Sequence, residues 1–171
     1  DIRVSWNIIS IIDPVLTSII IIFFFLCIFS KSIKFIKIGL TLSFSYLFLC
    51  FIQYHQIKSF VLSNSKDRGH KIERILLNPT IGNNILWRTI YQSDGYYFID
   101  GVYKPIFSKA KIINGTKIKV INKETIYPEL DQNSKQREDI RRFSYFSQDY
   151  IFLHPDFDDE ISDLRYGTLP Y

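Results

Sequence analysis

The sequence has no methionine, and it has only two cysteines and seven glycines among its 171 residues. It also lacks a glycine-rich phosphate loop, an HExxH zinc motif, a nucleophile elbow and a CxxC pair. These absences argue against the enzyme classes that are built on those motifs. Because translation starts at methionine, we expect the sequence to be a fragment or a processed product of a longer protein. Cys27 and Cys50 both lie in apolar runs, where a small hydrophobic role is favoured over a disulfide or a metal ligand.

Charge is missing from a long run near the start of the chain. Residues 14–30 contain no charged side chain, and residues 8–12 extend the run toward the amino terminus. A helix needs roughly 20 apolar residues to cross the hydrocarbon core of a bilayer, so residues 8–29 predict a membrane span. Asp13 and Pro14 stand inside this run. Asp13 is expected either to cap the helix that Pro14 opens or to belong to a polar or metal-linked site in a membrane cleft, and the two roles are compatible.

A second uncharged run of twenty residues, 38–57, follows a short basic turn. Together the two runs predict a transmembrane helical hairpin over residues 1–57, and the first run lacks the features of a cleaved signal peptide. The turn carries three basic residues: Lys31, Lys34 and Lys37. The flanks carry six: Arg3, Lys58, Lys66, Arg68, Lys71 and Arg74. Because cytoplasmic segments are enriched in Lys and Arg, this ratio favours cytoplasmic flanks and a cytoplasmic carboxyl-terminal half.

The pattern changes after residue 74, and the near-neutral mean hydropathy of +0.04 averages two unlike halves. Short β-branched and aromatic runs between residues 75 and 123 predict an antiparallel sheet of three to five strands. Turn signals bound these runs at Asn78-Pro79, Gly82-Asn83, Asp94-Gly95 and Asn114-Gly115. Residues 134–148 predict an amphipathic helix that is N-capped by Ser134 and covers the sheet. Its apolar stripe would be Ile140, Phe143 and Phe146. Residues 150–155 and 161–167 predict two further strands.

The predicted fold class is therefore α+β: a two-helix transmembrane hairpin followed by a small, mainly antiparallel β-sheet domain with a covering helix. We expect residues 1–57 to form the hairpin, residues 58–74 a helical or linker segment, and residues 75–171 the soluble domain. Within the sheet, Trp87 is expected in the core and Arg88 on the surface, because neighbouring residues of a strand point to opposite faces.

Potential metal ligands are few. His55 and His70 have no second ligand at helical spacing, so a solvated or interfacial position is favoured over metal binding. The acidic segment 154–160 is the densest cluster of such residues, but it lacks the glycine turn and the terminal glutamate of a calcium loop, so a solvated turn is favoured over a cation site. The predicted helix has a basic face that suits lipid headgroups better than nucleic acid, and no nucleic-acid partner is predicted. This face consists of Arg137, Arg141 and Arg142.

Four pieces of the sequence resemble one known family. They are RVSWNIISIIDPVLT, at residues 3–17, and then NNILWRTIYQSDGYY, FSYFS and DLRYGTLPY, in that order along the chain. These pieces are similar to segments of the membrane-bound, metal-dependent hydrolases, which are also described as LexA-binding, inner membrane-associated hydrolases. The positions that match the motifs of this family are Arg3, Trp6, Asp13, Pro14, Trp87, Arg88, Asp163, Arg165 and Gly167.

The resemblance implies a multi-pass protein of the bacterial inner membrane that uses a divalent metal for hydrolysis. The family has its metal ligands in an HRxxTHS motif and an HxxxD motif on earlier membrane helices, and neither motif occurs in the two apolar runs here. The chain would then be the carboxyl-terminal portion, inactive alone, with the lipid bilayer and the preceding membrane helices of the same protein as its partners. Asp13 would approach the metal ligands on those helices or orient them by hydrogen bonding.

Two functions follow from these observations. One is a membrane-embedded hydrolase in which a metal activates water, with Asp13 as the candidate catalytic residue and the soluble domain covering the site or admitting substrate. The alternative is a non-catalytic envelope or scaffold protein whose hairpin anchors a module that binds a partner or lipid.

Overall fold

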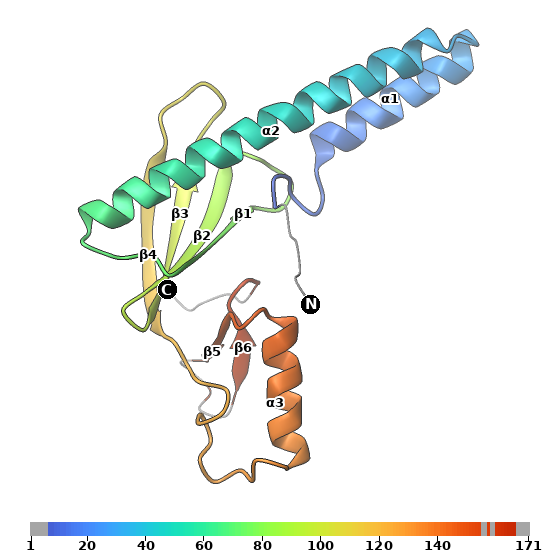
Figure 1. Ribbon diagram of the computed structural model, residues 1–171. Helices are drawn as coiled ribbons and strands as arrows, with labels where there is room; N and C mark the ends of the chain where they lie inside the picture. Colours follow the sequence, from blue (N-terminus) through green and yellow to red (C-terminus); the bar gives the residue numbers. More distant parts are fainter. Residues whose placement is uncertain (1–6, 155–156, 158–159, 167–171) are drawn as a thin grey trace.

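The computed structural model describes residues 7–154, 157 and 160–166. Within these residues the protein is an α+β structure with three helices, a four-stranded antiparallel sheet and a two-stranded ribbon (Figure 1). The elements are α1 (Pro14–Ser30), α2 (Lys34–Asp67), β1 (Arg74–Pro79), β2 (Leu86–Ser93), β3 (Tyr96–Tyr103), β4 (Lys111–Lys119), α3 (Lys135–Phe146), β5 (Ile151–Leu153) and β6 (Ile161–Asp163). The predicted α+β class is confirmed.

Helices α1 and α2 lie side by side and are joined by a short turn, and we call them the helical pair (Figure 1). Pro14 begins α1, and Lys31 ends it in the left-handed conformation with φ of 49°. The two helices approach closely where Gly39 of α2 faces Phe23 of α1. A Cβ atom on Gly39 would lie 2.6 Å from the Phe23 Cβ, so glycine is what allows this contact.

Helix α2 is 34 residues long, which corresponds to about 51 Å. It passes beyond the end of α1 and continues across the sheet (Figure 1). The first half exposes large apolar side chains such as Phe44 and Phe48, whereas the second half buries Ile57 and Val61. Residues 58–67 are therefore helical and continuous with the second apolar run.

The four-stranded sheet has the order β1-β2-β3-β4, with every neighbouring pair antiparallel. Asp94-Gly95 joins β2 to β3, and both residues have positive φ, 50° and 75°, as a two-residue hairpin turn of type I′ requires. The turn signal at Gly82-Asn83 likewise lies between β1 and β2. These two predicted turns are confirmed.

The signal at Asn78-Pro79 marks the end of β1, whose last residue is Pro79. The signal at Asn114-Gly115 is wrong, because this pair lies inside β4. The register between β3 and β4 shifts between Ile99 and Gly101, where Asn114 and Gly115 of β4 form a bulge opposite the single residue Asp100 of β3. A Cβ atom on Gly115 would lie 2.0 Å from the carbonyl oxygen of Ile99. Glycine is needed at this position because two backbones approach closely at the bulge, and not because the chain turns.

Different elements cover the two faces of the sheet. On one face, Ile57 and Val61 of α2 pack against a cluster that includes Leu77 and Trp87. On the other face, Ile90 and its neighbours pack against Phe152 and the rest of the ribbon β5-β6, which confirms the two further strands. The helix that covers the sheet is therefore α2. The prediction that α3 covers it is wrong, since neither core cluster contains an α3 residue and Phe146 is exposed.

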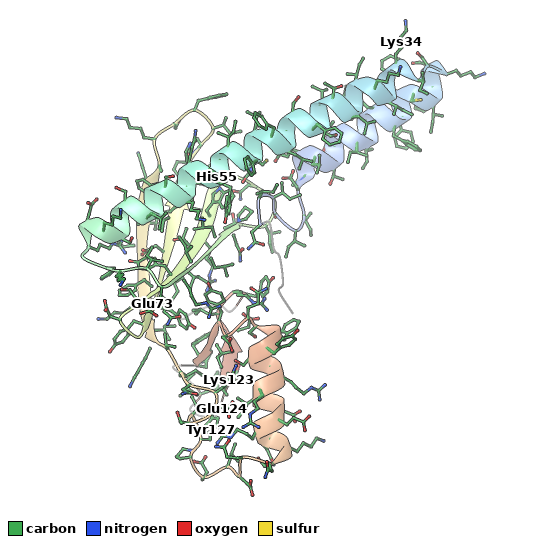
Figure 2. The ribbon with its side chains drawn as sticks, viewed as in Figure 1. Lys34, His55, Glu73, Lys123, Glu124 and Tyr127 are labelled. Atoms are coloured by element: carbon green, nitrogen blue, oxygen red, sulfur yellow. The ribbon has the colours of Figure 1, made fainter. Side chains whose placement is uncertain are left out.

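Helix α3 is instead held by the loop that precedes it. Ser134 caps α3 by accepting a hydrogen bond from the Arg137 backbone N–H, as predicted. The Arg137 guanidinium is fully buried and donates to the backbone carbonyls of Lys123, Tyr127 and Leu130. Figure 2 shows Lys123 and Tyr127 beside α3.

The prediction that α3 presents a basic face is therefore wrong for two of the three residues. Arg137 is buried, and Arg141 is bound to both carboxylate oxygens of Glu124. Arg142 alone of the three is largely exposed. Arg137 satisfies loop carbonyls from a buried position, and Arg141 is paired with a carboxylate, so α3 presents no continuous cationic surface.

Replacing Gly115 by Ala is expected to lower the free energy of unfolding by about 1–3 kcal/mol, because the new methyl group meets rigid backbone. The matched control is Gly101→Ala, whose Cβ would lie 3.3 Å from the Ile113 Cβ, a contact that a far smaller shift relieves. Thermal unfolding of both variants in detergent micelles, followed by far-UV circular dichroism, measures the difference. Equal stability of the two variants would contradict the close approach at the bulge.

Candidate functional site at the base of the helical pair

Asp13 lies between the two helices with only 6 % of its surface exposed. Its Oδ1 accepts a hydrogen bond of 2.9 Å from the Leu16 backbone N–H, so Asp13 is the N-cap of α1. Its Oδ2 accepts a hydrogen bond of 2.7 Å from the Tyr46 hydroxyl on α2. Both carboxylate oxygens therefore have a donor, and the predicted capping role is confirmed.

Further polar side chains surround this pair, and we call the set the polar cluster. The Cys50 thiol lies next to the Tyr46 hydroxyl and the Asn84 side chain, and it is almost completely buried. Two buried oxygens, Ser43 Oγ and Asn84 Oδ1, have no hydrogen-bond partner among the described residues. The members are Asp13, Ser43, Tyr46, Cys50 and Asn84. Because buried polar atoms usually find partners, the unpaired oxygens give the cluster the capacity to bind another polar group.

Gln53 joins the helical pair to the sheet one turn beyond the polar cluster. Its Nε2 donates to the carbonyl oxygen of Asn84, in the loop between β1 and β2. It also donates to the carbonyl oxygen of Lys104, after β3, at 2.9 Å. The Lys104 N–H in turn donates to the Ile85 carbonyl at 2.7 Å. One buried amide thus fixes two loops of the sheet against the middle of α2.

The predicted site residues divide into three groups. Asp13 and Pro14 lie at the base of α1, as described above. Trp87 is fully buried, as predicted, and its Nε1 donates to the Asn84 carbonyl, so it supports the loop that Gln53 also holds. Arg3, Trp6 and Gly167 lie outside the described residues.

Arg88, Asp163 and Arg165 form a separate group near the ribbon. Arg165 donates to both carboxylate oxygens of Asp163, with a shortest distance of 2.7 Å, and also to the Phe146 carbonyl. Arg88 donates to the carbonyl of Leu164, between these two residues. Arg88 is half-buried, so its predicted surface position is wrong: the ribbon covers the strand face that we expected to be open to solvent. The Asp163 carboxylate raises the pKa of Arg165 by hydrogen bonding.

A third polar network, at the carboxyl end of α2, was missed in the sequence. Arg68 donates to Asp100 at 2.7 Å and to Tyr91 at 3.3 Å, and the Tyr91 hydroxyl lies 2.9 Å from Nδ1 of His70. Burial raises the pKa of Tyr91, so this hydroxyl stays protonated at neutral pH. Asp100 also accepts from the Gly115 N–H. The network therefore fixes the end of α2 to the bulge, and His70 has a structural partner.

The described part of the chain contains no preformed metal site. In it, no group of three or more His, Cys, Asp or Glu side chains is close enough to hold a metal ion. His55 is exposed on the middle of α2 (Figure 2). Of the acidic segment, His154 and Glu160 are described and are linked by a backbone hydrogen bond of 2.9 Å. Asp156, Asp158 and Asp159 lie outside the described residues, so the prediction for this segment stays a prediction.

A hollow of about 360 Å³ lies beside the free edge of β1. Its lining comes from α2, β1 and the segment before β5, with Tyr54, Arg74 and Tyr150 as its large side chains. Arg74 already donates to the Gln148 carbonyl at 2.6 Å, and its guanidinium lies over the Tyr150 ring. These contacts leave the hollow without a free charged group, so it is a weaker candidate than the polar cluster.

The spacing of residues on α2 is the signal that could have revealed the polar cluster. Gly39, Ser43, Tyr46, Cys50 and Gln53 recur every three or four residues, so they share one helical face. In a run that is otherwise apolar, such a face predicts a helix contact lined by small and polar side chains.

Comparisons with protein-family models, with curated proteins and with solved structures found no match for the chain.

We predict that Asp13 and Tyr46 stabilise the protein as a coupled pair. Asp13→Ala removes a helix cap worth about 1 kcal/mol, and Tyr46→Phe removes the second donor. In a double-mutant cycle the two changes should show a coupling energy of about 0.5–3 kcal/mol, measured by thermal unfolding in micelles. Thr41→Ala is the control, because the exposed Thr41 hydroxyl donates only to the Lys37 carbonyl of its own helix. Additive effects of the two substitutions would refute the pairing.

Proposed function

We propose that the chain is a membrane-anchored module in which the helical pair crosses a lipid bilayer and holds the α+β domain at its surface. The observation that carries this proposal is the change of surroundings along α2. This helix is long and apolar enough to cross a membrane, and only 17 % of its most apolar stretch is buried. A helix in the core of a water-soluble protein would bury most of that stretch.

The distribution of exposed side chains supports the same arrangement. On α2, Leu40, Phe44 and Phe48 are more than half exposed. Beyond Ile52, no large apolar residue of α2 is exposed. On α1, no residue is buried, and large Ile, Phe and Leu side chains are exposed on the sides that do not face α2. Water would be a poor solvent for this surface, whereas hydrocarbon chains suit it.

The lengths also fit a bilayer. The stretch of α2 from Lys34, where the helix begins, to Ile52, its last exposed large apolar residue, corresponds to about 28 Å, close to the thickness of a hydrocarbon core. The 17 residues of α1 correspond to about 25 Å, and the apolar residues before Asp13 extend them. Lys31, Lys34 and Lys37 would then lie at the opposite membrane surface, and Figure 2 shows Lys34 at the tip of the pair.

We place the module in the inner membrane of a bacterium, with the α+β domain in the cytoplasm. The bacterial location rests on the sequence resemblance. The orientation rests on the larger number of Lys and Arg residues in the flanks than in the turn.

The test is the topology of variants that each carry one added cysteine in a Cys27→Ser background, reconstituted in vesicles. This background keeps the buried Cys50, whose labelling is measured on the parent. Ser32→Cys lies in the turn of the helical pair, and Thr116→Cys lies on the exposed face of β4. A membrane-impermeant maleimide added outside should label one of the two in intact vesicles and both after detergent is added. Labelling of both sites in intact, uniformly oriented vesicles would contradict a pair that crosses the bilayer.

A second candidate function, metal-dependent hydrolysis, is favoured by the polar cluster. A carboxylate beside a hydroxyl and a thiol inside an apolar helical pair is costly, and such residues in membrane segments often serve a reaction or transport step. In this proposal the metal ligands come from membrane helices outside this sequence. Asp13 would orient them with the lone pairs that Leu16 and Tyr46 leave free.

Metal analysis of the full-length protein, compared with its Asp13→Asn variant, tests this candidate. Asn keeps the size of the side chain and one acceptor for the Leu16 N–H, but it loses the charge. If Asp13 orients metal ligands, the variant should lose about 10–100-fold in metal affinity. Unchanged metal content and activity would leave Asp13 as a structural cap.

A further inference from the structure

Six large apolar side chains are exposed in three segments that are far apart in the sequence. Phe107 and Ile81 are the most prominent of those in the sheet domain, with exposed fractions of 95 % and 75 %. We call the whole set the apolar collar. Its members are Ile11, Ile12, Ile81, Ile85, Ile106 and Phe107.

Hydrogen bonds hold the three segments together. The Gly82 N–H donates to the Ile12 carbonyl and lies 3.1 Å from the Ser10 hydroxyl oxygen, which joins the turn after β1 to the segment before α1. The bond from Lys104 to Ile85 joins that same turn to the loop after β3. The collar is therefore one surface at one end of the sheet, as expected for the two loops β1–β2 and β3–β4 of an antiparallel meander.

The position of the collar along α2 is fixed by Gln53, which binds the carbonyls of both loops. The last exposed large apolar residue of α2 is Ile52, directly before Gln53. The apolar surface of the helical pair therefore ends where the apolar surface of the loops lies. Figure 1 shows the loop after β3 beside the middle of α2, and not beside either end.

The charges of these loops suit a lipid headgroup layer. The turn between β1 and β2 has no charged residue. The loop after β3 carries Lys104 and Lys109, with Lys111 at the start of β4, and has no acidic residue. The Lys104 ammonium group donates to the Ser108 carbonyl, which folds the loop back and leaves Phe107 at its tip. Exposed isoleucine and phenylalanine next to lysine are typical of segments that lie at the boundary between headgroups and acyl chains.

We propose that the apolar collar inserts into the headgroup–acyl boundary of the same bilayer that the helical pair crosses. This inference rests on the proposed membrane function and goes beyond it, because a domain held by α2 could also stand clear of the lipid surface. Besides the two helices, the loops β1–β2 and β3–β4 would then each hold the domain against the membrane. The polar cluster, directly inside the collar, is then shielded from bulk water.

The experiment places an environment-sensitive fluorophore at single cysteines of the reconstituted chain in the Cys27→Ser background. The vesicles contain phosphatidylcholine and phosphatidylglycerol, with quenchers attached at a shallow or a deep position of the acyl chain. The collar sites are Ile81→Cys and Phe107→Cys. Phe44→Cys reports on the helical pair, and Thr116→Cys on β4 is the aqueous control. Cys50 is 2 % exposed, and its background labelling is measured on the parent.

The collar sites should be quenched by the shallow lipid quencher at least about twofold more strongly than Thr116→Cys, and iodide in water should quench them less. If Phe44→Cys is quenched by lipid but the collar sites respond only to iodide, the collar proposal is overturned and the membrane function stands. If Phe44→Cys is not quenched by lipid, the membrane function itself fails. Collar sites protected from lipid quencher and iodide alike would be covered by protein, a second copy or a partner, which also overturns the proposal.

Discussion

One continuous helix, α2, has to satisfy two different surroundings along its length, and the arrangement of the remaining elements follows from this requirement. Its first half presents apolar side chains outward and contacts α1 through a narrow face of small and polar residues. Its second half contacts the sheet with Ile57 and Val61. No loop separates the two halves, so the domain cannot turn relative to the helix without unfolding part of it. In the proposed function, this continuity makes the membrane span and the domain a single rigid unit.

The change of surroundings occurs at the residues that are hardest to accommodate in an apolar setting. Asp13 and Gln53 are both buried, and each satisfies partners on two elements. A buried amide or carboxylate that lost its partners would cost about 1–3 kcal/mol or more. This cost gives the junction a specific geometry, because sliding α2 against α1 or against the sheet would break these bonds. The polar cluster is thus sufficient to explain the register of the helices, and its two unpaired oxygens leave capacity for a further ligand.

The sequence predicted the elements better than their packing. Apolar runs, a capping serine and an Asp-Gly turn are local signals, and the helices, the β2–β3 hairpin and the N-caps at Asp13 and Ser134 were found from them. Packing depends on residues that are distant in the chain. Gly115 was therefore predicted to be a turn residue although it lies in a bulge of β4, and Arg137 was expected at the surface although loop carbonyls surround it. The partner of Asp13 was also beyond the sequence, since Tyr46 is 33 residues away.

In the proposed function, α2 passes from lipid to protein at Gln53. The most direct measurement is a scan of nitroxide spin labels along exposed positions of α2 in lipid vesicles, comparing collisions with oxygen and with a water-soluble nickel complex. We expect oxygen collisions to dominate at the outward-facing residues up to Ile52, and nickel collisions to rise from His55 onward as the helix leaves the bilayer. A helix that is equally accessible to the nickel complex along its whole length would contradict the account.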